Sequence, residues 1–276
     1  MNTSFEISWY GSHSGEEPPI SGTKGSGTIF FCGCNLHCVY CQNWQISQQH
    51  IRCKKVNDEE LIKIILELQE QGLNNINLVT PTIWSVQLIE VLKKAKQKGL
   101  KIPVVWNSNA YEKVEILKRL EGLVDVYLPD YKYTDDYLAK KYSGISNYSE
   151  VAQLAIKEMY RQVGDLRVDK GNRGNRGMIV RHLVLPSHLE NTKKCLEFIR
   201  LISDNIHLSL MTQYGPLYKA KDYPEINRTL NKKEDEVVRK LIKDLEFKNG
   251  WTQEFGKSVK CFNPDFSLEF PFSNRK

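Results

Sequence analysis

The sequence TIFFCGCNLHCVYC, at residues 28–41, sets a short apolar run directly before three closely spaced cysteines. The run Thr28–Phe31 predicts a strand buried on both faces, because it is continuously apolar instead of alternating. From this point short apolar runs alternate with longer helical patterns six times, which is the βα pattern of a parallel sheet. The predicted strands are Thr28–Phe31, Asn75–Thr80, Ile102–Asn107, Val124–Pro129, Met178–Leu185 and Leu208–Gln213.

Helical patterns fill the intervals between these runs. Asn57, followed by acidic residues and then by apolar residues at helical spacing, predicts an N-cap, and Gly72 predicts the end of that helix. The other predicted helices are Trp84–Lys98, Tyr111–Leu120, Glu150–Val163, Thr192–Ile202 and Lys232–Glu246.

Six βα units in a row predict an α/β fold, a partial (β/α)6 barrel of parallel strands, because crossovers are right-handed and consecutive strands tend to be neighbours. A doubly wound flat sheet is the alternative. We expect residues 27–249 to form the barrel. Residues 1–26, rich in Gly, Ser and Pro, predict an N-terminal extension, and residues 250–276 predict a C-terminal extension.

Composition and charge narrow the classes of protein. Hydrophobic residues make up 41% of the 276 residues and charged residues 26%, which is typical of a packed globular fold and not of a disordered chain. No apolar run approaches the roughly 18 residues of a membrane span, and the N-terminus lacks the plan of a signal peptide. We therefore expect a cytoplasmic protein with no membrane partner. The net charge of +6 is spread over helical faces, so a nucleic-acid partner is not expected.

Cys34, Cys38 and Cys41 are the candidate metal ligands. The chain has an odd number of cysteines, seven, and in a reducing compartment metal ligation outranks a disulfide framework. Three thiolates on one tight loop can bind three irons of a [4Fe–4S] cluster and leave the fourth iron open. A zinc loop is the alternative, which His37 or Cys32 would have to complete, because structural zinc takes four ligands. Cys32 fits more simply as a small buried filler.

The cysteine loop, GCNLHCVYCQNW at residues 33–44, resembles that of radical S-adenosylmethionine (SAM) enzymes. More closely, the chain is similar to uncharacterised iron–sulfur proteins related to pyruvate formate-lyase activating enzymes. The similarity rests on residues 21–31, NINLVTPT at 75–82, VYLPDYK at 126–132, RHLVLP at 181–186 and SLMTQY at 209–214, and it covers residues 11 to 255. It implies a partial barrel in which SAM chelates the open iron beside the cysteine loop.

The resemblance implies a reaction as well as a fold. A reduced [4Fe–4S] cluster passes one electron to SAM, which splits to give a 5′-deoxyadenosyl radical that takes a hydrogen from an unidentified substrate. This substrate is either a glycyl radical enzyme, activated at a glycine Cα–H, or a peptide or small molecule. The partners implied are a one-electron donor such as flavodoxin or ferredoxin and a protein substrate. A non-catalytic iron–sulfur or zinc binding protein is the rival hypothesis.

Polar residues at the carboxyl ends of the strands are the candidate SAM contacts, because these ends face the site in a parallel barrel. The preferred anchor is Asp130 with Lys132, which matches the Asp-x-Lys of the activating enzymes. Lys132 can meet the SAM carboxylate while Asp130 balances the sulfonium and the ribose. A surface salt bridge is the alternative. No side chain beyond the cluster ligands is assigned a catalytic role.

The remaining candidate SAM contacts are Tyr40, Gln42, Thr80, Asn107, Arg181 and Gln213. Thr80 would meet the SAM amino group, and a capped helix start at Thr82 is the alternative for this segment. Gln213 would meet the adenine edge, which Tyr40 and Gln42 would touch from the cysteine loop. Strand alternation predicts that Arg181 and His182 face opposite ways, and a core histidine is an equal interpretation of His182.

Overall fold

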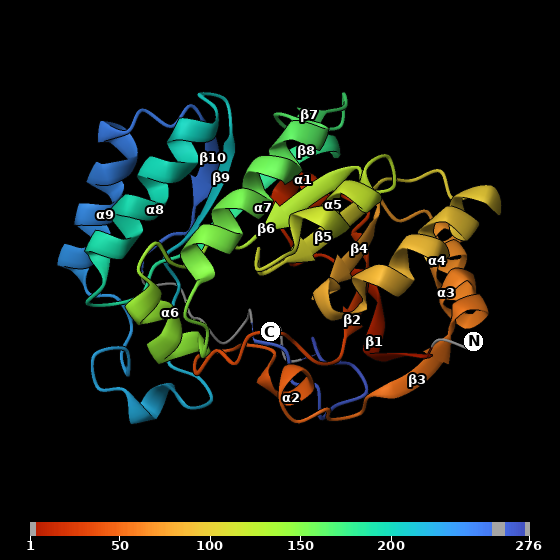
Figure 1. Cartoon of the computed structure of the whole chain (residues 1–276), viewed down its shortest axis with the longest axis horizontal. Coiled ribbons are helices and arrows are strands. Elements are labelled where there is room, and N and C mark those ends of the chain that lie inside the picture. Colours follow the sequence, from red (N-terminus) through yellow and green to blue (C-terminus); the bar gives the residue numbers. More distant parts are fainter. Residues whose placement is uncertain (1–3, 256–262, 274–276) are drawn as a thin grey trace.

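The strands form one open sheet whose neighbours in space are mostly neighbours in the chain (Figure 1). The computed structural model describes residues 4–255 and 263–273. Within these residues the order of the 10-stranded sheet is β10-β9-β8-β6-β5-β4-β2-β1-β3, with β7 paired to β8. The strands are β1 (Ser4–His13), β2 (Ser26–Phe31), β3 (Lys54–Asn57), β4 (Ile76–Val79), β5 (Val104–Ser108), β6 (Val126–Pro129), β7 (Arg167–Val168), β8 (Gly174–Leu183), β9 (His207–Met211) and β10 (Asn249–Thr252).

The six predicted strands are the parallel centre of this sheet. β2, β4, β5, β6, β8 and β9 pair in parallel and in chain order. The order never reverses along these strands, so the sheet is not doubly wound, and the predicted partial (β/α)6 barrel is confirmed. β10 adds a parallel strand beside β9.

The N-terminal segment adds an antiparallel edge to the sheet. β1 pairs with β2 from Ile7↔Phe31 to His13↔Ser26, and on its other side it pairs with β3. Residues expected only as an extension therefore form part of the sheet. Phe5, Ile7 and Trp9 alternate with polar residues, which is the period-2 pattern of a strand, and pairing on both sides holds the segment in the sheet.

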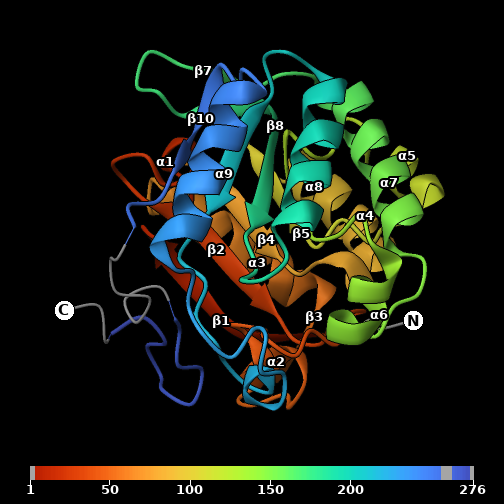
Figure 2. The same cartoon turned by 90° about the vertical axis from the view of Figure 1, so that its left-hand side faces the viewer.

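Helices cover the outer face of the sheet as an arc, from α3 and α4 through α5 and α7 to α8 and α9 (Figure 1), and Figure 2 shows the strands within this arc. The helices are α1 (Pro18–Ser21), α2 (Trp44–Ser47), α3 (Asp58–Glu70), α4 (Ser85–Gln97), α5 (Val114–Leu120), α6 (Asp136–Ser143), α7 (Tyr148–Val163), α8 (Leu189–Ile202) and α9 (Lys232–Asp244). α3 begins at the predicted cap: Asn57 Oδ1 accepts from the Glu60 N–H at 3.0 Å, and Glu60 Oε2 accepts from the Asn57 N–H at 2.7 Å. No helix within the described residues is long and apolar enough to cross a membrane.

The inner face of the sheet carries an apolar layer and then a polar layer. Ile20 of α1 packs there in one apolar cluster with strand residues Val105, Val126, Leu128 and Ile179. Because side chains alternate along a strand, the residues two positions after Val105, Leu128 and Ile179 face the same way. These residues are Asn107, Asp130 and Arg181. The polar groups of the candidate site therefore form the next layer after the apolar cluster around Ile20, closer to the carboxyl ends of the strands.

Candidate active site

The cysteine loop leaves β2 at the carboxyl end of the parallel strands. Gly33 starts the turn with a φ of 81°, a backbone conformation that favours glycine. Further along, the N–H groups of His37 and Val39 donate to the carbonyls of Ser143 and Tyr142 at 3.0 and 2.9 Å. These carbonyls belong to the last turn of α6, where a helix offers them no internal partner. The end of α6 therefore fixes the backbone of the loop between its first and last cysteine.

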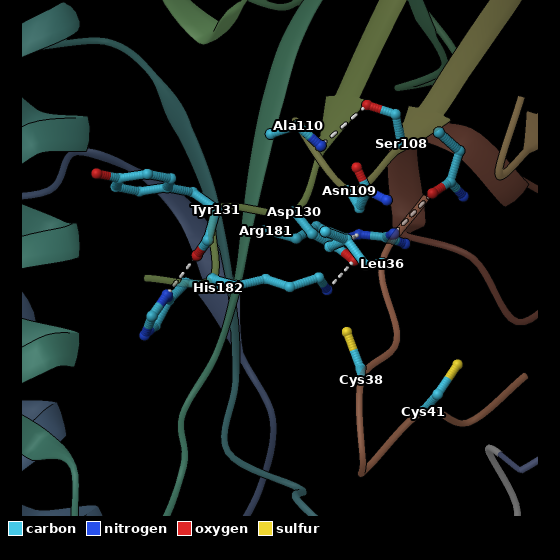
Figure 3. A network of polar contacts seen from close by, with 12 residues as sticks. Leu36, Cys38, Cys41, Ser108, Asn109, Ala110, Asp130, Tyr131, Arg181 and His182 are labelled. Carbon is cyan, nitrogen blue, oxygen red and sulfur yellow. Dashed lines mark hydrogen bonds and ion pairs between the residues drawn. The ribbon is translucent and has the colours of Figure 1, made fainter. Parts of the chain in front are cut away.

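The three cysteines of the loop are free thiols, and each sulfur has a polar neighbour. Figure 3 shows the sulfur atoms of Cys38 and Cys41 beside each other, directed to the side on which Asp130 and Arg181 lie. The neighbouring groups are Asn109 Nδ2 at 3.4 Å from Cys34 Sγ, Ser143 Oγ at 3.0 Å from Cys38 Sγ and Ser47 Oγ at 3.4 Å from Cys41 Sγ.

The electrostatics of the three sulfurs favour a bound metal that compensates the charge of their thiolates. Burial, followed by the charge of Cys38, raises the pKa of Cys34 to about 11 and that of Cys41 to about 12. Lys132 opposes this effect at Cys34 and Cys38 by lowering their pKa. Buried thiols this close to each other ionise when a metal compensates their charge. Three soft sulfurs with N–H and O–H groups directed at them fit a [4Fe–4S] cluster. Within the described residues, including this loop, no group of three or more His, Cys, Asp or Glu side chains is arranged to hold a single metal ion.

A buried charged network faces the cysteine loop (Figure 3). Arg181 donates from Nε to Asp130 Oδ1 and from Nη2 to Asn107 Oδ1, both at 2.6 Å. Lys132 Nζ donates to Asp130 Oδ2 at 2.8 Å. Burial opposes the charge of Asp130, but Arg181 and Lys132 more than offset it, so the pKa of this carboxyl lies below its usual range. The side chains of Lys132 and Arg181 are each only 15% exposed, which excludes the surface salt bridge considered for the Asp130–Lys132 pair.

Glu16 and Glu17, neither of which was predicted as a site residue, join this network from the loop before α1. Their carboxylates lie 3.6 and 3.7 Å from Arg181 Nη1. Ser209 Oγ donates to Glu17 Oε1 at 3.2 Å, and Asn107 Nδ2 donates to Glu16 Oε2 at 3.5 Å. Burial, followed by the charge of Glu17, raises the pKa of Glu16 to about 7. The only sequence signal was a pair of acidic residues before Pro18, which does not indicate that they contact β8.

Four of the predicted SAM contacts lie outside this network. Tyr40 is buried, and its hydroxyl lies 2.5 Å from that of Tyr133. Thr80, at the end of β4 with a φ of 59°, touches Asn107 through its backbone N–H, which donates to the Asn107 carbonyl at 2.9 Å. Gln42 and Gln213 turn instead towards C-terminal residues. Gln42 Nε2 donates to Asn263 Oδ1 at 3.3 Å, and Gln213 Nε2 donates to the Glu254 carbonyl at 3.4 Å.

Arg181 and His182 face opposite sides of β8, as alternation predicts. His182 is fully buried between Tyr131 and Thr192. Its Nδ1 lies 2.7 Å from the Tyr131 carbonyl and its Nε2 lies 3.0 Å from Thr192 Oγ1. Burial lowers the pKa of His182 to about 4, so the imidazole is neutral at physiological pH. His182 is a satisfied core histidine, and Arg181 is the residue that faces the site.

Cys32 differs from its predicted role. It is buried, as expected of a filler, but it is joined to Cys53 in a disulfide. β2 ends at Phe31 and Gly33 turns the chain, and Cys32 packs with Phe30 in a cluster separate from the one that includes the three free thiols. The disulfide encloses the whole cysteine loop within residues 32–53. Of the seven cysteines, Cys261 lies outside the described residues.

The fold and the cysteine loop define an α/β protein of the radical SAM partial-barrel type. Residues 28–164 match the family model of the radical SAM superfamily. The chain therefore contains a radical SAM domain over these residues. Two solved structures share the fold: HydG, a maturase of the [FeFe]-hydrogenase (TM-score 0.54, 16% identity, 79% of this chain and 49% of that chain), and Streptococcus suis SuiB (TM-score 0.53, 12% identity, 81% and 47%).

Curated relatives include activating enzymes. The chain is 40% identical over 238 residues to the uncharacterized protein MJ0674 of Methanocaldococcus jannaschii, covering 83% of this chain and 64% of that protein. It is 32% identical over 109 residues to a putative glycyl-radical enzyme activating enzyme of the same organism, covering 40% of this chain and 44% of that protein. It is 24% identical to the pyruvate formate-lyase-activating enzyme of Clostridium pasteurianum, covering 83% and 97%. The chain thus spans less than two thirds of the length of the first two relatives.

Proposed function

We propose that this chain is an enzyme that holds a [4Fe–4S] cluster through Cys34, Cys38 and Cys41 and cleaves SAM reductively. Together, the cluster and SAM supply one-electron chemistry that yields a 5′-deoxyadenosyl radical, which abstracts a hydrogen from a substrate. The observation that carries this proposal is the placement of three free, hydrogen-bonded thiols opposite a buried charged network in a radical SAM domain.

The charged network is the proposed SAM anchor. Lys132 offers an ammonium to the SAM carboxylate, and Asp130 offers a carboxylate to the cationic and ribose side of SAM. Arg181 is a positioning residue, because it holds Asp130 and Asn107 from one guanidinium. Asn107 and Thr80 are proposed contacts to the polar groups of SAM. Burial of the network excludes water and strengthens each of these interactions.

The nucleoside of SAM is proposed to lie against the cysteine loop and the end of β9. Tyr40, next to Cys41, offers an aromatic edge. Gln42 and Gln213 offer amide groups to adenine, and they reach it by leaving Asn263 and Glu254.

The proposed substrate is a glycine Cα–H of a partner protein, which would become a glycyl radical enzyme. The names of the activating-enzyme relatives favour this substrate. A peptide or small molecule is the second candidate, since the chain spans only part of its first two relatives. Both candidates require a one-electron donor such as flavodoxin or ferredoxin.

The test starts with anaerobic reconstitution of the full chain. We expect about four irons per chain and slow release of 5′-deoxyadenosine from SAM under strong reductant, even without substrate. Cys38→Ala should lose the cluster, whereas Cys195→Ala, which removes a free buried cysteine on α8, should keep it. A full iron content in Cys38→Ala would exclude the ligand assignment. Absence of 5′-deoxyadenosine from the reconstituted wild type would favour a non-catalytic cluster protein.

The two substrate candidates are separated by what the radical leaves behind. Incubation with candidate partner proteins should produce a backbone radical visible by electron paramagnetic resonance, and exposure to oxygen should cut that backbone. A modified metabolite or peptide in the mass spectrum, without a protein radical, would favour the second candidate.

A further inference from the structure

A row of buried hydroxyl groups ends on the sulfur of Cys38. Ser143 Oγ lies 3.0 Å from Cys38 Sγ, Tyr133 Oη lies 2.9 Å from Ser143 Oγ, and Tyr40 Oη lies 2.5 Å from Tyr133 Oη. Ser143 and Tyr133 are fully buried and Tyr40 is 7% exposed, so bulk water does not compete for these hydrogen bonds. The row joins three separate segments of the chain: the cysteine loop, the end of α6 and the residues after β6.

The chemistry of the last acceptor sets the direction of every hydrogen in the row. A cysteine bound to iron is a thiolate, which accepts hydrogen bonds and donates none. Ser143 must then donate its single hydrogen to Cys38 Sγ and accept from Tyr133. Tyr133 donates its own hydrogen to Ser143 Oγ and accepts the hydrogen of Tyr40. The row is therefore polarised from Tyr40 towards the sulfur, and each hydrogen bond strengthens the next in a buried, low-dielectric setting.

We infer that Ser143, Tyr133 and Tyr40 form a hydrogen-bond relay that raises the reduction potential of the cluster through Cys38. This inference rests on the proposed cluster site. Reduction adds negative charge, which spreads over the sulfur ligands. An O–H group aimed at one of them stabilises the reduced state more than the oxidised state. Hydrogen bonds to the sulfurs are among the features that set the potentials of iron–sulfur clusters. Ser143 touches the ligand, and the two tyrosines are positioning residues that act through it.

The backbone explains why the relay is held in place. The same residue, Ser143, gives its side chain to Cys38 and its carbonyl to the His37 N–H. Gly144 then ends α6 with a φ of 77°. The hydroxyl of Ser143 is therefore fixed relative to the loop by main-chain contacts, and Tyr133, which packs against the ring of Tyr148 at 5.4 Å, is fixed by aromatic packing.

The test is a redox titration of the reconstituted full chain without SAM, followed by electron paramagnetic resonance. Ser143→Ala should lower the equilibrium constant for one-electron reduction by about tenfold, which corresponds to about 59 mV. Tyr133→Phe should lower it less, and Tyr40→Phe least, because each is one hydrogen bond further from the sulfur. Tyr127→Phe is the matched control, because its buried hydroxyl donates to Gln162 on the helix side of the sheet, away from the loop. It should leave the potential unchanged.

The outcomes separate this inference from the proposed function. A wild type that binds no cluster would contradict the proposed function itself. A wild type with a full cluster, together with Ser143→Ala at an unchanged potential, would overturn the relay alone. If Ser143→Ala takes up no iron, the potential of Tyr133→Phe tests the relay instead. This variant removes only the Tyr133 hydroxyl and keeps both its ring and Ser143. An unchanged potential in Tyr133→Phe, or a shift as large in Tyr127→Phe, would then overturn the relay.

Discussion

Replacing Glu16 by Gln should stabilise the folded protein at neutral and alkaline pH. Glu16 is buried beside Glu17 and Arg181, and its pKa is raised to about 7 by burial and by the charge of Glu17. A glutamine resembles the protonated carboxyl in size and in its ability to donate to Glu17. The substitution therefore keeps the contacts of the neutral form and removes the need to bury a charge.

The size and the sign of the effect follow from the pKa. Folding raises the pKa of Glu16 from 4.5 to about 7, so the folded state holds this proton more tightly than the unfolded state. The stability due to Glu16 is present at low pH and is lost as the pH rises from about 4.5 to about 7. Each pKa unit is worth about 1.4 kcal/mol, so the total loss is about 3 kcal/mol. The free energy of unfolding of Glu16→Gln should exceed that of the wild type by less than about 1 kcal/mol at pH 5 and by about 3 kcal/mol at pH 8.

Urea unfolding followed by circular dichroism measures this difference. Wild type and Glu16→Gln would be compared at pH 5 and pH 8, both metal-free and prepared in the same way. Glu70→Gln on α3 is the control, because Glu70 is exposed and its replacement should change stability by less than about 0.5 kcal/mol at either pH. A Glu16→Gln protein that is less stable than the wild type at pH 8, or a difference independent of pH, would refute the reasoning.

Three further substitutions or measurements test the site. Lys132→Ala should weaken SAM binding by at least about tenfold, since it removes a charged hydrogen bond, and should leave the iron content unchanged; equilibrium dialysis with an unaltered affinity would remove Lys132 from the site. Arg181→Leu should lower the free energy of unfolding in urea by about 3–5 kcal/mol, because Glu16, Glu17 and Asp130 lose the buried guanidinium that they share, although Lys132 still pairs with Asp130; a loss below about 1 kcal/mol would show that the network tolerates unpaired charge. Peptide mapping without reductant should recover Cys32 linked to Cys53, with the loop cysteines open to alkylation in metal-free protein; free Cys53 would contradict the disulfide.

The parallel centre of the fold was predictable because its strands are buried on both faces. Predominantly apolar runs such as Val124–Pro129, interrupted only by Asp125, identify such strands, and the structure places β6 at Val126–Pro129. β1 was missed although Phe5, Ile7 and Trp9 alternate with polar residues as in a strand, because the Gly, Ser and Pro residues that follow them favoured a peripheral extension. α6 was also missed: Asp136–Ser143 is a helix of only 8 residues, too short for its buried Leu138, Ala139 and Tyr142 to establish a helical period in the sequence.

The part of the candidate site that lies at the carboxyl ends of the strands was predictable from the sequence. Asn107, Asp130 and Arg181 lie at or near the carboxyl ends of neighbouring parallel strands, and this rule predicted them together with the resemblance to the activating enzymes. Glu16 escaped the rule because it enters the site from a loop, through a contact with a residue 165 positions away in the sequence, Arg181. Gln213 departs from it because β9 ends at Met211, so Gln213 lies beyond the strand and bonds to Glu254.

The most direct test of the central claim is whether SAM binds the iron that the three cysteines leave open. Electron–nuclear double resonance on the reduced, reconstituted protein would detect this with SAM isotopically labelled at its amino nitrogen. We predict a hyperfine coupling between the label and the cluster in the wild type, and no cluster signal in Cys38→Ala. A cluster whose spectrum is the same with and without saturating labelled SAM would contradict the claim.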